Sequence, residues 1–311
     1  MALTILLRDL QPLYGWQLAL WHGDHGWHGA SAAVAKELVA WARIQDLTVW
    51  TDRAEPGEAG REAAARHWRY GCLARRARHW DCQHVVAGHT ATDRAETVLL
   101  NLARGCHRRG LASMGPSRPL TDERAGEPSL ALVRPLLAFD RADTADVCRE
   151  RRLPVWLDPS NNDTQLRRNR LRAEVLPVLE ACHPGACRRI SLQAERLAEE
   201  LATEKELLQL AIRNLEGRLG SFVTLDRAAL AQLSPSTRGL VLAWWLRERT
   251  GVIHKASSLD SLEYRLRNSW GHGRHDLQGG WCLSWTSTHL ALGQSTHGQP
   301  DARSGPDEPH G

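Results

Sequence analysis

The sequence lacks the features that mark membrane and secreted proteins. No run approaches the roughly 18 consecutive apolar residues of a transmembrane helix. The opening residues MALTILLRDL carry neither a basic segment nor a small-residue cleavage site, so they predict no secretory signal. The seven cysteines include no CxxC pair, which favours reduced thiols over a disulfide framework or a zinc site. We therefore expect a cytoplasmic protein with no membrane partner.

Lysine is also scarce, and nearly all of the positive charge is arginine. The formal net charge is +4, and six arginines against two glutamates lie between Leu166 and Arg189. Planar guanidinium groups match phosphate well, so this segment favours a polyanionic partner. A solvated helix face is the alternative that composition leaves open.

The 311 residues, 42% of them hydrophobic, supply core material for one large or two moderate domains. Apolar strands are expected at 16–22, 47–50 and 84–89, and helices at 31–44, near 59–80 and from 90 onward. This alternation predicts an α/β fold in which helices cover both faces of a parallel sheet. We expect a catalytic domain over 1–183, a smaller, mainly helical domain with short strands such as GWCLSW and HLAL over 184–293, and a disordered tail over 294–311.

Three side chains at the end of the third strand form the strongest candidate site. His89 ends the strand, and Asp93 and Glu96 lie three residues apart on the following helix, so their side chains share a face. Carboxylates are favoured in the first turns of a helix. The trio could orient a nucleotide, hold a metal or act as acid and base. The same spacing also fits an ordinary capped helix with a pair of surface carboxylates.

Other polar groups follow strand ends or punctuate helices. The segment HGDHGWH at 22–28 holds three histidines and Asp24, but its glycines break the spacing of helical zinc motifs, so we predict a pocket-shaping turn and no metal site. Arg66 and Arg69 share a helix face that could simply be solvated. The basic turn ARGCHRRGL at 103–111 could meet phosphate or merely end a helix.

Four blocks, in order, resemble the tRNA(Ile)-lysidine synthetase family, a branch of the PP-loop ATPases. They are HGDHGWHGAS at 22–31, REAAARHWRYGCL at 61–73, GHTATDRAETVLLNLARGCHRRGLASM at 88–114, and LVRPLL at 132–137 with DPSNNDTQLRRNRLRAEVLPVL at 158–179. The last two blocks are the specific ones, because related PP-loop enzymes share the strand and helix order but not RNRLR.

The resemblance implies a ligase that uses ATP with Mg²⁺. ATP would adenylate the C2 oxygen of the wobble cytidine in tRNA(Ile) with a CAU anticodon, and free lysine would displace AMP to give lysidine. A homodimer is one assembly that such an enzyme could form. By match to the family, the catalytic residues are Arg69, His89, Asp93 and Glu96, the nucleotide-binding residues Asp24, His25, His89 and Arg104, and the RNA-binding residues Arg108, Arg109, Arg168, Asn169, Arg170 and Arg172.

The sequence departs from the family at its phosphate loop. Family members open with a strand and a glycine-rich SGGxDS loop whose backbone N–H groups bind pyrophosphate, and this motif does not occur in the sequence. The residues MALTILLRDL resemble the helix that follows that loop. We expect Met1 to be an internal methionine with the true start upstream; otherwise the chain is truncated and would turn over little ATP.

Three functions are therefore open on sequence grounds. The first is the lysidine-forming ligase. The second is another PP-loop enzyme, such as an amidotransferase synthetase domain or a tRNA thiolase, although thiolases of that type usually need cysteine pairs. The third is a non-catalytic RNA-binding remnant that has lost its phosphate loop.

Overall fold

The computed structural model describes residues 1–26, 31–55, 57–58, 62–120, 130–156, 163–219, 222–268 and 271–294. Contacts divide the chain into two compact units, Met1–Leu201 and Ala202–Gly311. The division falls inside α9 (Ala186–Leu215), whereas the sequence placed a boundary ahead of that helix, between 183 and 184. The tail that we expect to be disordered lies, from residue 295, outside the described residues.

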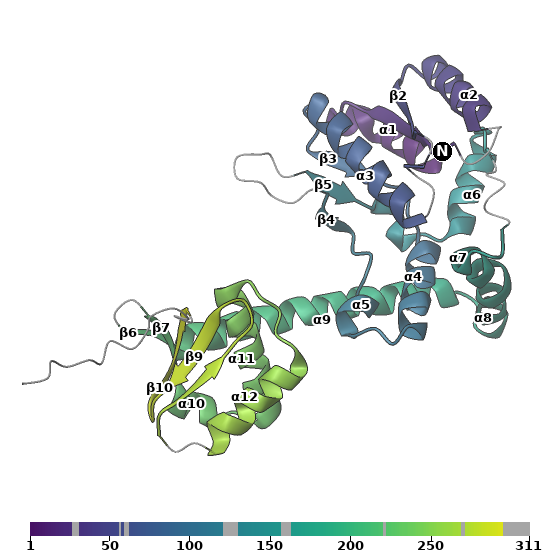
Figure 1. The fold of residues 1–311 in the computed structure, drawn as a ribbon. Helices are drawn as coiled ribbons and strands as arrows, with labels where there is room; N and C mark the ends of the chain where they lie inside the picture. The colour runs from purple at the N-terminus through teal and green to yellow at the C-terminus, as the bar shows by residue number, and fades with distance from the viewer. Residues whose placement is uncertain are drawn as a thin grey trace, which may run out of the picture. The chain divides into compact units, whose positions relative to one another are not determined.

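Strands and helices alternate in the N-terminal unit (Figure 1). Its first half contains α1 (Ala2–Tyr14), β1 (Ala19–Asp24), α2 (Ser31–Ile44), β2 (Thr48–Arg53), α3 (Glu62–His79), β3 (His84–Val86) and α4 (Ala91–Ala103). Its second half contains α5 (Arg108–Leu111), β4 (Ser117–Pro119), β5 (Ala131–Val133), the 3₁₀ helix η1 (Pro135–Ala138), α6 (Arg141–Glu150), α7 (Arg167–Arg170), the π-helical turn η3 (Leu171–Val175), α8 (Leu176–Cys182) and the start of α9.

The strands of this unit pair mainly in parallel. β1 pairs with β2, with Trp21 opposite Trp50, and β3 pairs with β5, with Val85 opposite Leu132. β4 adds to the far side of β5 in the antiparallel direction. Parallel neighbours need a crossover connection, and α2 supplies it between β1 and β2. The α/β class expected from the sequence is confirmed.

A largely apolar cavity of about 280 Å³ lies between the two groups of strands. Its walls include Leu20 of β1, Val85 of β3, and Leu3 and Leu7 of α1. In the described part of the chain no strand lies between β1 and β3, and α3 packs against both of them. Helix packing therefore joins the two groups of strands where direct backbone pairing does not.

The C-terminal unit has its own core. After α9 come β6 (Glu216–Leu219), β7 (Phe222–Asp226), α10 (Arg227–Gln232), α11 (Pro235–Thr250), α12 (Ala256–Asn268), β8 (Gly273–Asp276), β9 (Trp281–Trp285) and β10 (His289–Gln294). The strands form an antiparallel sheet in the order β6-β7-β10-β9-β8, which includes both strand-like pieces noted in the sequence. Trp245 and Leu283 are fully buried in this core. None of the described helices is long and apolar enough to cross a bilayer.

Candidate active site

The first turns of α4 hold two buried acidic side chains. The backbone N–H and the hydroxyl of Thr90 both donate to Oδ2 of Asp93 at 2.9 Å, in a capping box at the start of the helix. Glu96 follows three residues later. Asp93 is 9% exposed and Glu96 is 0% exposed. The shared face predicted from the spacing is present, and it is buried, so the alternative of a surface carboxylate pair is excluded.

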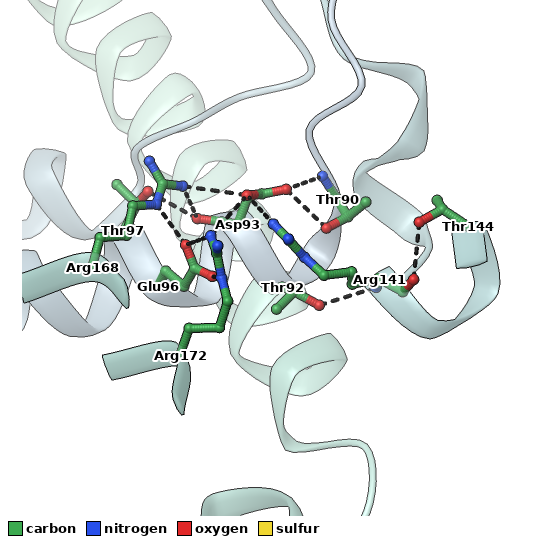
Figure 2. A network of polar contacts seen from close by, with 9 residues as sticks. All are labelled: Thr90, Thr92, Asp93, Glu96, Thr97, Arg141, Thr144, Arg168 and Arg172. Atoms are coloured by element: carbon green, nitrogen blue, oxygen red, sulfur yellow. Dashed lines mark hydrogen bonds and ion pairs between the residues drawn. The ribbon is translucent and has the colours of Figure 1, made fainter. Parts of the chain in front are cut away.

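Two arginines from the RNRLR block hold Glu96 (Figure 2). Nε of Arg168 donates to Oε2 at 2.5 Å, and Nε of Arg172 donates to Oε1 at 2.6 Å. The two arginines lie four residues apart on α7 and η3, and thus on one side of a continuous helical segment. A buried carboxylate without a partner would cost several kcal/mol. These two ion pairs make the complete burial of Glu96 tolerable.

Asp93 lies among positive charges as well. Arg141, the first residue of α6, donates to Oδ1 at 3.2 Å, and Arg168 lies 3.5 Å from the same oxygen. Burial alone would raise the pKa of Asp93, but the hydrogen bonds from Thr90 and the charges of Arg141 and Arg168 outweigh it and lower the pKa. Two carboxylates thus meet three guanidinium groups, so the arginines of the cluster outnumber its acidic side chains.

His89 supplies a neutral imidazole next to this cluster. Burial, assisted by the charges of Arg134, Arg168 and Arg66 and opposed by Asp93, lowers the pKa of His89 to about 4. Its Nδ1 is buried and has no hydrogen-bond partner among the described residues. A buried polar atom without a partner is unfavourable. His89 therefore offers one unoccupied hydrogen-bonding atom to a ligand.

The lowered pKa of His89 gives a testable pH dependence of stability. The unfolded chain takes up a proton near pH 6.5, whereas the folded protein keeps the imidazole neutral down to about pH 4. The stabilisation is therefore complete above pH 6.5 and is lost as the pH falls toward 4. We expect His89→Asn to flatten the unfolding free energy over this window by up to about 1.4 kcal/mol per pH unit. Urea unfolding at pH 7, 6, 5 and 4.5 measures it, and identical slopes for the two proteins would contradict it.

A second group of predicted residues meets at the end of β1. Asp24, 5% exposed, lies 3.5 Å from Nε of Arg53. Burial would raise the pKa of Asp24, but hydrogen bonds, the first from Ser31, and the charge of Arg53 lower it. The guanidinium of Arg69 lies 3.0 Å from Nε2 of His25. Arg69 thus lies with His25, next to the strand that ends in Asp24.

The other predicted site residues have separate surroundings. Arg104 follows the last residue of α4, and Arg108 and Arg109 are exposed on α5. Arg170 pairs with Glu174 at 2.9 Å. Asn169 is buried and donates to the backbone oxygen of Asp163 at 3.0 Å. The four polar residues of the RNRLR block are therefore divided, because only Arg168 and Arg172 reach the buried carboxylates. The DPSNN residues that precede this block, at 158–162, lie outside the described residues.

Sequence reasoning missed two arginines at this site. Arg141 contacts Asp93. The sequence feature that could have identified Arg141 is its place in the first turn of a helix, where the helix dipole disfavours positive charge. Arg134 follows β5 within the quoted LVRPLL block and is 3% exposed. Its signal was a charged residue in an otherwise apolar segment.

Comparison with known proteins identifies the structural class of this protein. Residues 1–179 match the family model of the PP-loop domain. A solved structure of a U34-tRNA thiolase, NcsA from Methanococcus maripaludis with its [4Fe-4S] cluster, aligns with a TM-score of 0.50 at 16% identity, over 63% of this chain and 68% of that one. At that identity the likeness concerns the fold alone. The protein has the fold of the PP-loop class, and its site lies in the PP-loop domain.

Named relatives identify the family within this class to which the chain belongs. The tRNA(Ile)-lysidine synthase of Parasynechococcus marenigrum (strain WH8102) is 47% identical over 94% of this chain and 85% of its own length. That of Prochlorococcus marinus (strain NATL1A) is 34% identical over 96% of this chain and 91% of its own. The chain belongs to the tRNA(Ile)-lysidine synthase family. The resemblance drawn from the four sequence blocks is confirmed.

Proposed function

We propose that the protein uses ATP to join lysine to C2 of the wobble cytidine of tRNA(Ile), forming lysidine. In the first step the C2 oxygen attacks the α-phosphorus of ATP, and pyrophosphate leaves. In the second step the ε-amine of free lysine attacks C2, the C2–oxygen bond breaks, and AMP leaves with that oxygen. Family membership supports this reaction. The structural observation that carries it is the buried Asp93–Glu96 pair, which Arg168 and Arg172 hold at the start of α4.

The charges around the trio define a role for each side chain. Asp93 would accept a hydrogen bond from the incoming lysine amine, and Glu96 would keep Arg168 and Arg172 in place. The three arginines around the carboxylates favour the neutral, nucleophilic form of that amine. His89, with a pKa of about 4, is far too weak a base to keep a proton taken from a lysine amine of pKa near 10.4. We therefore assign to His89 the orientation of the amine through its unpartnered nitrogen, and the proton passes to solvent. Arg168 and Arg172 stabilise the negative charge that develops as AMP leaves.

The group at the end of β1 is assigned to the nucleotide. Asp24, His25 and Arg69 would contact ATP at the carboxyl end of a parallel strand, where ligands bind in open α/β sheets. Among the described residues, no group of three or more His, Cys, Asp or Glu side chains could hold a metal ion. Mg²⁺ is usually bound by one or two carboxylates together with substrate phosphates. We propose that Mg²⁺ enters with ATP and that Asp24, an ionised carboxylate, contacts it.

The partners follow from this reaction. They are tRNA(Ile) with a CAU anticodon and free lysine, and the reaction takes place in the cytoplasm. The target cytidine must leave the anticodon stack to expose its C2 oxygen, as bases do in other enzymes that modify them. Assembly as a homodimer stays a prediction, which light scattering on the purified protein decides.

A labelling assay tests the proposal. The protein, expressed with any in-frame residues encoded ahead of Met1, is incubated with radiolabelled lysine and a tRNA(Ile) transcript, with and without ATP. We expect label in the tRNA only with ATP and only when the anticodon is CAU; a UAU transcript is the matched control. ATP turnover with no lysine transfer would favour another PP-loop modification. RNA binding with neither ATP turnover nor lysine transfer would favour a non-catalytic remnant.

A further inference from the structure

A cavity of about 580 Å³ in the N-terminal unit is lined by arginine. Six guanidinium groups come from α3, the end of α4, β4, the residue after β5, and α7: Arg66, Arg104, Arg118, Arg134, Arg167 and Arg168. The described residues of its wall include no carboxylate. So many like charges around one space repel one another unless an anion lies between them.

Arg134 carries an unsatisfied donor at this cavity. It is 3% exposed, and one terminal nitrogen donates to the backbone oxygen of Gly115 at 2.7 Å. Its Nε is buried and has no hydrogen-bond partner among the described residues. Leaving a buried donor unpaired is unfavourable. A ligand with acceptor oxygens would remove that cost.

Tyr70 orders the arginines in advance. The guanidinium of Arg118 lies 4.8 Å from the centre of the Tyr70 ring, and that of Arg66 lies 5.1 Å from it. Burial would raise the pKa of Tyr70, but the nearby charges of Arg66, Arg118 and Arg134 lower it, so all three arginines lie close to its hydroxyl. Stacked guanidinium groups lose little freedom when they bind a ligand. The cavity is thus a prearranged cluster of donors.

We propose that this cavity binds phosphodiester groups of the RNA strand next to the nucleotide that is modified. The inference rests on the proposed function and adds to it the place where the RNA backbone is held. Arginine forks bind phosphate oxygens in pairs, which supplies both charge and geometry. Arg66, Arg104 and Arg167 are exposed, so the cluster reaches the surface, as contact with a polymer requires.

The position along α4 differs from that of a typical triphosphate site. Leu100, Asn101 and Arg104 bring the C-terminal end of α4 to the cavity. Triphosphate sites commonly use the free N–H groups and positive dipole at helix N-termini, whereas a helix C-terminus presents carbonyl oxygens and negative potential. At this end of α4 the helix backbone supplies no positive potential, so the arginine side chains must hold any bound anion. Arg104, which the resemblance grouped with the nucleotide, is thereby assigned to RNA.

The cavity is adjacent to the buried carboxylates. Arg168 lines it and also donates to Glu96 at 2.5 Å. A phosphate bound there lies one side chain away from the proposed reaction centre. The arrangement would hold the strand while the neighbouring cytidine turns toward Asp93 and His89.

Direct binding measurements test this inference separately from catalysis. The purified protein and its Arg66→Gln and Arg104→Gln variants are titrated with a synthetic anticodon stem-loop RNA across a range of NaCl concentrations, and separately with ATP. We expect each variant to bind the RNA about tenfold more weakly, to lower the slope of log K against log salt by about 0.7, and to bind ATP normally. Arg43→Gln is the matched control, because Arg43 is an exposed arginine of α2 outside the cavity wall.

The outcomes separate this inference from the ligase proposal. Loss of ATP affinity with unchanged RNA affinity would assign the cavity to the triphosphate and overturn the inference, as would unchanged binding of both ligands. Weaker RNA binding in the variants of a protein that never transfers lysine would uphold the RNA contact and refute the ligase. Normal lysine transfer together with unaltered RNA binding in the variants would refute the RNA contact and uphold the ligase.

Discussion

Asp93→Ala is expected to abolish lysidine formation and leave the fold intact. The substitution removes an ionised carboxylate that faces Arg141 and Arg168 at the proposed reaction centre. The loss of one charge-stabilising group from an active site typically slows catalysis by about 10²–10³-fold. Because this carboxylate also orients the incoming amine, we expect lysine incorporation to fall below detection. Single-turnover labelling of tRNA(Ile) measures the effect.

The effect of Asp93→Ala on stability can be measured separately from its effect on catalysis. Asp93 accepts a hydrogen bond from Thr90 in the capping box of α4, and losing a helix cap costs about 1 kcal/mol. α6 begins with an equivalent box, in which the N–H of Asp140 donates to Asp143 at 2.7 Å. Asp143→Ala should therefore lower the melting temperature by a similar few degrees and retain full activity. Near-normal lysine transfer by Asp93→Ala would remove Asp93 from the site.

Glu96→Gln is expected to cost the most stability of any single change at the site. Glu96 is fully buried, and its charge is balanced by Arg168 and Arg172. Removing one partner of a buried ion pair leaves an uncompensated charge and typically costs about 3–5 kcal/mol. Because 26% and 23% of the two arginine side chains are exposed to water, we expect about 3 kcal/mol, at the lower end of that range.

Glu174→Gln is the matched control for this prediction. Glu174 pairs with Arg170 one helical turn away, and the two side chains are 52% and 68% exposed. Exposed pairs at this spacing contribute about 0.5 kcal/mol or less. Urea unfolding should show a large fall in midpoint for Glu96→Gln and almost none for Glu174→Gln, with unchanged slopes. Equal changes in the unfolding midpoint for the two substitutions would contradict the prediction that the buried ion pairs of Glu96 stabilise the fold more than the exposed pair of Glu174.

Local signals predicted the parts of the site that depend on local structure. Asp93 and Glu96 share a face of α4 because three residues make nearly one helical turn. The strand expected at 16–22 begins later, at Ala19. Gly15 ends α1 in the left-handed conformation, with φ of 66°, and Trp16 stacks on Tyr14 instead of joining the strand.

Local sequence signals do not predict contacts between distant segments of the chain. Arg168 and Arg172 come from a segment more than seventy residues after Glu96, so no periodicity indicates that they meet. The resemblance to a family marked these arginines as important but grouped them with the RNA. Arg134 and Tyr70 likewise come from distant segments of the chain, so no local pattern indicates that they meet.

The sequence alone determined the alternation of strands and helices, the shared face of Asp93 and Glu96 and, through its four blocks, the tRNA(Ile)-lysidine synthase family. These properties depend on neighbours within a few turns of chain or on residues matched in order. Tertiary structure alone decided that both carboxylates are buried, that His89 is neutral, and that six arginines surround one cavity. Burial and charge depend on which distant segments pack together, and the free energy of that packing is a property of the whole fold.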